Sequence, residues 1–132
     1  MGVTLVGREE IAENIHKDGS GQPLSALNIG EGTTDFDPSD TSLEDELDFE
    51  GGLTTSRDSD KVIIQTEFTD NQGAVTEAGM VAQGSPSDST QDSFDSDNDV
   101  QVVRQQIPEI NVLAEDKIDL TFELQALNDG SN

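Results

Sequence analysis

Negative charge is the feature that most constrains how this chain can fold. Its 132 residues include 29 Asp and Glu but only six Lys and Arg, which gives a formal net charge of -23. Charges of one sign repel one another, so the compact state is strained in dilute buffer. Molar salt shortens the Debye length from about 10 Å to about 3 Å and removes most of that repulsion. We therefore expect the chain to fold and act at high ionic strength.

The acidic residues are spread along the whole chain, and lysine is as scarce as arginine. This pattern resembles proteins of halophiles that accumulate salt. Apolar segments suited to strands persist between the acids, which distinguishes the chain from the alternative, a disordered acidic protein. A nucleic-acid partner is not expected, because no basic stripe is present to neutralise phosphates.

The length of the chain suits one compact domain. We expect that domain over residues 1–127, followed by a flexible tail at 128–132. The chain has no cysteine, which excludes disulfides and zinc sites that use sulfur. No apolar run approaches the roughly 18 residues of a membrane span, and the first residues lack the basic start of a secretory signal. We therefore expect no membrane contact.

Helical spacing occurs near the N-terminus. Over residues 7–17, Ile11 and Ile15 stand four apart with polar residues on the other face, and Thr4 is suited to cap the helix. Residues 42–47 predict one or two further helical turns, with their acids near the positive end of the helix dipole. The chain is thus expected to contain one short amphipathic helix and a second, smaller one.

Most of the remaining structure is expected to be β. Strand-like segments occur at residues 24–30, 61–68, 74–82, 100–103 and 118–124. The second and third of these are expected to pair as a hairpin, Gly79 suggests a bulge or a close backbone approach, and Pro108 is expected to end the fourth. The last segment alternates strictly between apolar and polar residues. The expected fold is α+β, mainly β with a short N-terminal helix, packed as a small antiparallel β-sandwich.

Residues 84–99 form an acidic loop rich in Ser and Asp that cannot build a core, and we expect it to be exposed and mobile. Within it, Asp95, Asp97 and Asp99 stand at alternate positions and could converge on one hard cation such as Ca²⁺. The positions at which an EF-hand needs Gly and Glu hold other residues. The sequence therefore argues against an EF-hand and leaves an irregular cation site as the hypothesis. A solvated acidic loop without a specific ion is the alternative.

The sequence contains few residues that could support catalysis. His16 is the only histidine, and its place at the predicted helix end suits a surface residue. No serine lies in a nucleophile elbow, and no carboxylate lies in a run apolar enough to raise its pKa for acid catalysis. The motif at residues 30–32 lacks the third glycine and the helix of a dinucleotide fingerprint. We expect neither an enzyme nor an organic cofactor.

The order of five motifs carries a resemblance to a known family. The motifs lie at residues 7–12 (GREEIA), 28–34 (NIGEGTT), 40–46 (DTSLEDE), 75–80 (VTEAGM) and 113–124. In this order they resemble the N-terminal domain of phage tail-collar fibres and related minor structural proteins of tailed viruses. The resemblance implies a virion module that forms symmetric homo-oligomers, and the acidity implies a virus of a halophilic archaeon.

We therefore expect a non-enzymatic virion structural protein, either a capsid decoration or turret or a tail-fibre or tail-connecting subunit. Its expected partners are further copies and other capsid or tail proteins, and its location is the virion after synthesis in the host cytoplasm. Val75, Ala78, Met80, Val100 and Val102 are candidates for buried or subunit-facing surface. A free-standing cation- or ligand-binding module of a halophile is the alternative function.

Overall fold

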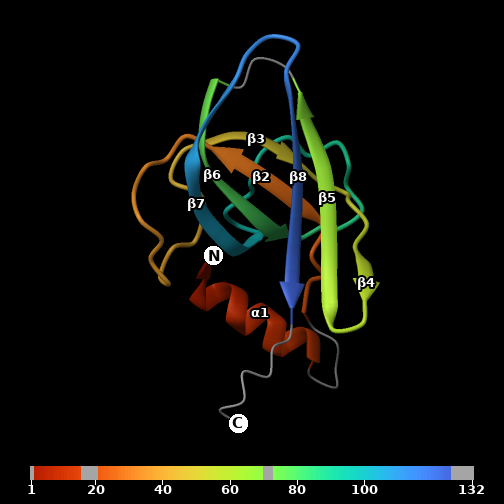
Figure 1. The fold of residues 1–132 in the computed structure, drawn as a ribbon. Coiled ribbons are helices and arrows are strands. Elements are labelled where there is room, and N and C mark those ends of the chain that lie inside the picture. Colours follow the sequence, from red (N-terminus) through yellow and green to blue (C-terminus); the bar gives the residue numbers. More distant parts are fainter. Residues whose placement is uncertain (1, 16–20, 70–72, 126–132) are drawn as a thin grey trace.

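The computed structural model describes residues 2–15, 21–69 and 73–125. In chain order the elements are β1 (Gly2–Val3), α1 (Leu5–Ile15), β2 (Ala26–Gly30), β3 (Glu46–Glu50), β4 (Ser56–Asp58), β5 (Lys61–Thr69), β6 (Gly73–Ala82), β7 (Val100–Val112) and β8 (Lys117–Gln125). Figure 1 shows two layers of strands with the helix across one end. The expected fold class, mainly β with a short N-terminal helix and antiparallel sheets, is confirmed.

The strands form a five-stranded sheet in the order β1-β7-β6-β2-β3 and a three-stranded sheet in the order β4-β5-β8. β5 and β6 are consecutive in the chain but belong to different sheets, so the hairpin predicted for residues 61–68 and 74–82 is wrong. The physical reason is burial. β6 is buried along most of its length and needs strands on both sides, which the centre of the larger sheet supplies.

The main core lies between the two sheets. Its largest buried side chains are those of Leu27, Ile29, Ile64, Phe68, Met80 and Phe122. β8 confirms the alternation predicted for residues 118–124, because its apolar side chains pack against this core while the residues between them are exposed. Burying each such large side chain contributes roughly 1.5–3 kcal/mol.

The helix α1 begins two residues earlier than predicted, because Thr4 caps it. Thr4 Oγ1 accepts a hydrogen bond from Gly7 N at 2.9 Å and donates one to Gln101 O at 2.6 Å. The same hydroxyl therefore caps the start of the helix and fastens the helix to β7. Ile11 packs against the core, whereas Ile15 is exposed, and the last two residues of the predicted helix lie outside the described part of the chain.

The helical turns predicted for residues 42–47 are wrong. This segment is irregular until β3 begins at Glu46. The backbone N–H groups of Glu44 and Asp45 donate to the carboxylate of Glu77, at 2.9 Å each. The sequence of residues 42–47 favours a helix, but these hydrogen bonds to the buried carboxylate on β6 hold the segment in an irregular conformation instead.

The pairing of β6 with β7 accounts for a proline and a glycine inside strands. The sequence predicts that Pro108 ends its strand, but β7 continues to Val112. The register between β6 and β7 shifts beside Pro108, so this residue, which has no backbone N–H, does not need to donate a hydrogen bond to β6. A Cβ at Gly79 would lie 2.6 Å from Val103 O and 2.7 Å from Asn28 Oδ1. The close backbone approach predicted for Gly79 is confirmed.

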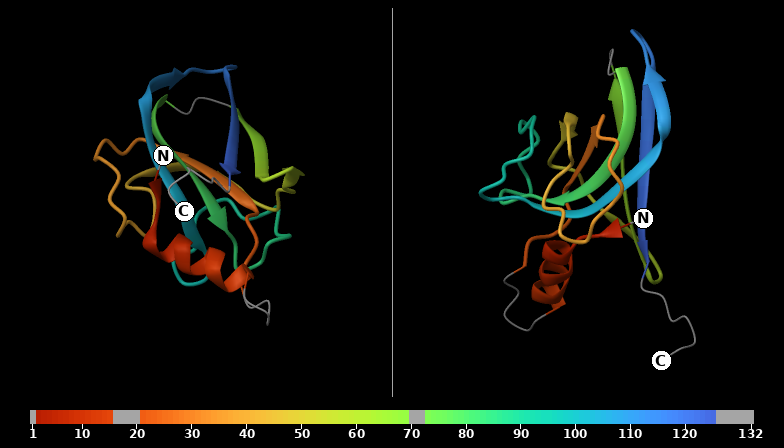
Figure 2. Two further views of the ribbon diagram at one scale, coloured as in Figure 1. Left: turned by 60° about the horizontal axis from the view of Figure 1, so that its bottom comes forward. Right: turned by 90° about the vertical axis from the view of Figure 1, so that its left-hand side faces the viewer.

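The face of the five-stranded sheet that turns away from the main core is the outer face. Two long connections cover it, the anchored loop (residues 31–45) and the acidic loop (residues 84–99). The right-hand view of Figure 2 shows both on the side of this sheet opposite to the three-stranded sheet. The outer face is therefore buried although many of its residues are polar.

Candidate functional site

Buried charged residues on the outer face are the strongest candidates for a functional site, because a buried charge needs a specific partner. Glu77 on β6 and Arg104 on β7 both turn toward this face. Arg104 Nε donates to Glu77 Oε1 at 2.9 Å, and the two side chains are 1% and 0% exposed. They form a charge-assisted hydrogen bond inside the protein.

The Glu77 carboxylate also binds the backbone of the anchored loop. Its Oε2 accepts from Gly32 N at 2.7 Å and Asp45 N at 2.9 Å, and its Oε1 accepts from Glu44 N at 2.9 Å. The adjacent Thr76 hydroxyl donates to Gly32 O at 2.6 Å. Each carboxylate oxygen thus has two donors, which leaves no acceptor position for an external ligand.

Arg104 fastens the middle of the same loop. Its Nη1 donates to Asp40 Oδ2 at 3.1 Å and Asp35 O at 3.2 Å, and its Nη2 donates to Thr34 O at 2.8 Å. Only a planar guanidinium with several fixed donors can reach these groups together, and lysine could not. Three of the motifs that carry the sequence resemblance, at residues 28–34, 40–46 and 75–80, therefore meet at this ion pair.

Asn28 and Gln101 extend the polar row along the outer face. Asn28 Nδ2 donates to Gln101 Oε1 at 2.9 Å, and Gln101 Nε2 donates back to Asn28 Oδ1 at 3.0 Å. Asn28 Nδ2 also donates to Glu46 Oε2 at 2.9 Å, while Glu46 Oε1 accepts from Phe94 N at 2.9 Å. Burial raises the pKa of Glu46 above its usual value, and the hydrogen bond from Asn28 opposes this rise. The row thus links β3 to the acidic loop.

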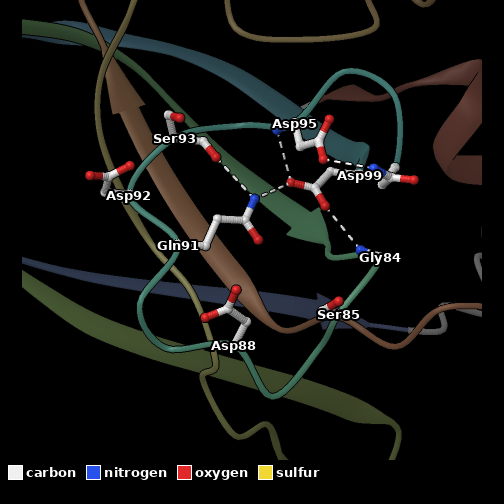
Figure 3. A pocket seen from close by; sticks show the side chains of 9 residues that line it. Gly84, Ser85, Asp88, Gln91, Asp92, Ser93, Asp95 and Asp99 are labelled. Atoms are coloured by element: carbon white, nitrogen blue, oxygen red, sulfur yellow. Dashed lines mark hydrogen bonds between the residues drawn. The ribbon is translucent and has the colours of Figure 1, made fainter.

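Asp99 organises the acidic loop (Figure 3). Its Oδ1 accepts from Gly84 N at 2.9 Å, and its Oδ2 accepts from Asp95 N at 3.0 Å and from Gln91 Nε2. Phe94 packs against an apolar cluster on the outer face of the sheet. The loop is exposed over most of its length, as predicted, but these contacts hold it at its ends and in its middle.

The predicted cation ligands are only partly brought together. A hollow of about 470 Å³ in the acidic loop is lined by Asp95 and Asp99 but not by Asp97. The Asp95 carboxylate accepts from Asn98 Nδ2 at 2.8 Å and Asp97 N at 3.0 Å, and these bonds, the first above all, lower its pKa. Over residues 2–15, 21–69 and 73–125, no three His, Cys, Asp or Glu side chains are placed to hold one metal ion.

The five apolar candidates for buried or subunit-facing surface lie inside one chain. Val75, Ala78, Met80 and Val102 are at most 1% exposed, and Val100 packs against the same core. For the first four the structure shows burial, so their side chains are not available to another subunit, whereas Val100 is half-buried.

Glu77 and Arg104 are not among the residues predicted for a site, although two signals point to them. Arg104 is one of only six cations in the chain and follows directly on a run of strand-forming apolar residues. Glu77 falls inside the apolar segment at residues 74–82. A charge within an apolar strand indicates a buried partner, and these two are each other's partner.

Fold and site together define a small antiparallel sandwich in which a buried ion pair fastens the anchored loop to one face of a sheet. In the described part of the chain, no helix is long and apolar enough to cross a membrane. A comparison with protein-family models and with curated proteins finds no match to this chain. His16 and the tail predicted at residues 128–132 lie outside the described residues.

Proposed function

We propose that this chain is a non-enzymatic structural subunit of a tailed-virus particle, placed at the capsid surface or in the tail, where it binds other protein subunits in high salt. The observation that carries the proposal is the fixed outer face. Glu77 and Arg104 hold the anchored loop against the sheet, Glu46 on β3 accepts from Phe94 N of the acidic loop, and Asp99 joins the two ends of that loop by accepting from Gly84 N. Loops that are ordered before contact lose less conformational freedom on binding, which suits a surface for lasting protein contacts.

The chemistry of the buried pair supports a structural role. A general acid or base must come within hydrogen-bond reach of the proton that it transfers. The Glu77 carboxylate is enclosed by Arg104 and three backbone amides, all within 2.9 Å. These contacts position the anchored loop and leave neither side chain open to a substrate.

The sequence supports the virion part of the proposal. The motifs that resemble tail-collar fibre modules include those that meet at the Glu77–Arg104 pair, so the resemblance falls on residues that shape the fold. The net charge of -23 fits a particle that must stay dispersed in molar salt. Together these features favour a structural subunit of a halophilic virus.

The test is the location of the chain in infected cultures. Particles are purified on a density gradient in molar salt and labelled with a gold-conjugated antibody against this chain. We expect label at regular positions on the particles, and a constant ratio of this chain to the major capsid protein across the particle fractions. A non-structural protein of the same virus serves as control and should stay in the soluble fraction. Recovery of this chain with that control alone would overturn the proposal.

A further inference from the structure

β8 is a long sheet edge without a partner on one side. It pairs with β5 in nine consecutive positions, from Lys117 opposite Thr69 to Gln125 opposite Lys61, without a register shift. In the described part of the chain no strand pairs with its other side. Figure 1 shows that side of β8 open within its own layer. Such an edge presents a row of backbone N–H and C=O groups that another strand can bind.

The other sheet edges carry features that prevent pairing. β3 has three acids among five residues and a register shift against β2. β4 has three residues and β1 has two, and the part of β7 beyond β1 contains Pro108 and a shift in register. Acidic side chains, short strands, proline and bulges all oppose the addition of a strand. β8 has no proline, no bulge and no charged residue on its inner face, so it is the edge open to pairing among the described strands.

The three-stranded sheet is also the part of this acidic protein where charge nearly balances. Its strands contain three cations, Arg57, Lys61 and Lys117, against four acids, Asp58, Glu67, Asp119 and Glu123. Their sum is a net charge of -1, whereas the whole chain carries -23. Two copies of the chain can approach through this sheet with far less repulsion than through other surfaces.

We propose that β8 pairs antiparallel with β8 of a second copy about a two-fold axis at Leu120, which joins the two three-stranded sheets into one of six strands. On the exposed face, Lys117 then lies opposite Glu123 of the second copy, twice by symmetry. On the inner face, Ile118 lies opposite Phe122, and the apolar row continues from one copy to the next. This dimer rests on the proposed function and specifies which surface joins two copies of the subunit.

Charge selects this register among its neighbours. An axis at Thr121 would place Asp119 opposite Glu123, and an axis at Asp119 would place that carboxylate opposite its own copy. Like charges directly opposed across strands are destabilising. An axis at Phe122 avoids such pairs but leaves Lys117 without an acid opposite. The axis at Leu120 combines a long overlap with two opposite-charge contacts.

The test is the dimer dissociation constant, measured by sedimentation equilibrium in molar KCl. Lys117→Glu turns two attractive contacts into repulsive ones, and we expect the dissociation constant to rise roughly tenfold. Adding Glu123→Lys restores the charge pairs and should restore the dimer. Arg57→Glu is the matched control. It makes the same charge change in the same sheet, but it lies on β4, which β5 separates from Glu123 and from the free edge of β8, and it should leave the constant unchanged.

A wild-type chain that stays monomeric at high concentration would overturn the dimer, as would equal effects of Lys117→Glu and Arg57→Glu. Hydrogen exchange gives a readout that needs no variant. Amides of β8 that face the free edge should gain protection as the protein concentration rises, while those of the β3 edge should not. If the chain is found in purified particles but only as a monomer, the dimer is refuted and the structural role stands. If the chain dimerises in solution but is absent from the particles, the structural role is refuted and the dimer stands.

Discussion

Replacing Glu77 by Gln tests the buried ion pair with little change in shape. The carboxylate accepts four hydrogen bonds, two on each oxygen, from Arg104 Nε and from the amides of Gly32, Glu44 and Asp45. The amide side chain of Gln retains one oxygen, and its NH₂ group would face two N–H donors. Arg104 would also lose one of its two acidic partners in a buried position.

The cost of this change follows from the number of groups left without partners. Removing one partner of a buried ion pair costs roughly 3–5 kcal/mol. Hydrogen bonds to charged groups contribute about 1.5–3 kcal/mol each, and these losses overlap with the first. We therefore expect Glu77→Gln to lower the free energy of unfolding by about 4 kcal/mol, out of the roughly 5–15 kcal/mol of a typical domain.

Urea unfolding followed by far-UV circular dichroism in molar KCl measures this loss, because the chain has no Trp or Tyr for fluorescence. With a slope of about 1.5 kcal/mol per molar urea, the midpoint should fall by about 2.7 M. Glu67→Gln is the matched control. Glu67 pairs with Lys117 at 3.8 Å, both side chains are more than half exposed, and the loss should stay below about 1 kcal/mol. Equal shifts in the two variants would refute the reasoning.

A double variant separates the ion pair from the loop amides. Replacing both partners of a buried ion pair by apolar residues is often neutral or stabilising. Here Glu77→Met with Arg104→Met would still leave the amides of Gly32, Glu44 and Asp45 unpaired, because each donates to the carboxylate. We expect the double variant to be as unstable as Glu77→Gln. Stability equal to wild type would show that the anchored loop does not depend on this carboxylate.

Three further predictions concern the glycines, the pH dependence and the acidic loop. Gly79→Ala should lower the free energy of unfolding in urea by roughly 1–3 kcal/mol, since its Cβ would lie 2.6 Å from Val103 O. Gly73 has a φ of 78° and open space around it, so Gly73→Ala should lower the free energy of unfolding by about 1 kcal/mol through backbone strain alone. Because burial raises the pKa of Glu46 in the folded state, the contribution of Glu46 to stability should fall as pH rises from the ordinary Glu pKa of 4.5 through the raised value. The decrease in stability just above pH 4.5 should therefore be smaller in Glu46→Gln. Asp97→Ala should leave calcium binding by calorimetry unchanged, since Asp97 does not line the hollow in the acidic loop.

The sequence predicts those parts of the fold that depend on local patterning. The alternation at residues 118–124, the helix cap at Thr4 and the close approach at Gly79 each follow from a few neighbouring residues, and the structure confirms all three. Strand pairing depends on which faces must be covered, and for this reason the hairpin predicted for residues 61–68 and 74–82 is wrong.

The site is harder to predict because it is made of long-range contacts. Arg104 lies 27 positions from Glu77 and 70 from Thr34 along the chain. The apolar surroundings of Glu77 and of Arg104 indicate that each charge is buried, but no local spacing shows that the two pair with each other. The segment at residues 42–47 shows the same effect, since its helical preference is overridden by a carboxylate on β6. Composition identifies the acidic surface but cannot show which charge is buried.

Salt acts in opposite directions on the two electrostatic contributions to the proposed dimer. Each copy carries a net charge of -23, and most charges on the two copies are farther apart than directly opposed side chains. Raising ionic strength from 0.1 M to 1 M shortens the Debye length from about 10 Å to about 3 Å, which removes this distributed repulsion almost entirely. The contacts between Lys117 and Glu123 span only about 5 Å across paired strands and are weakened less. Dimerisation should therefore strengthen from 0.1 M to 1 M KCl, while the effect of Lys117→Glu shrinks without vanishing. Weaker dimerisation over the same range would mean that the charge pairs, rather than the backbone and apolar contacts of β8, hold the copies together.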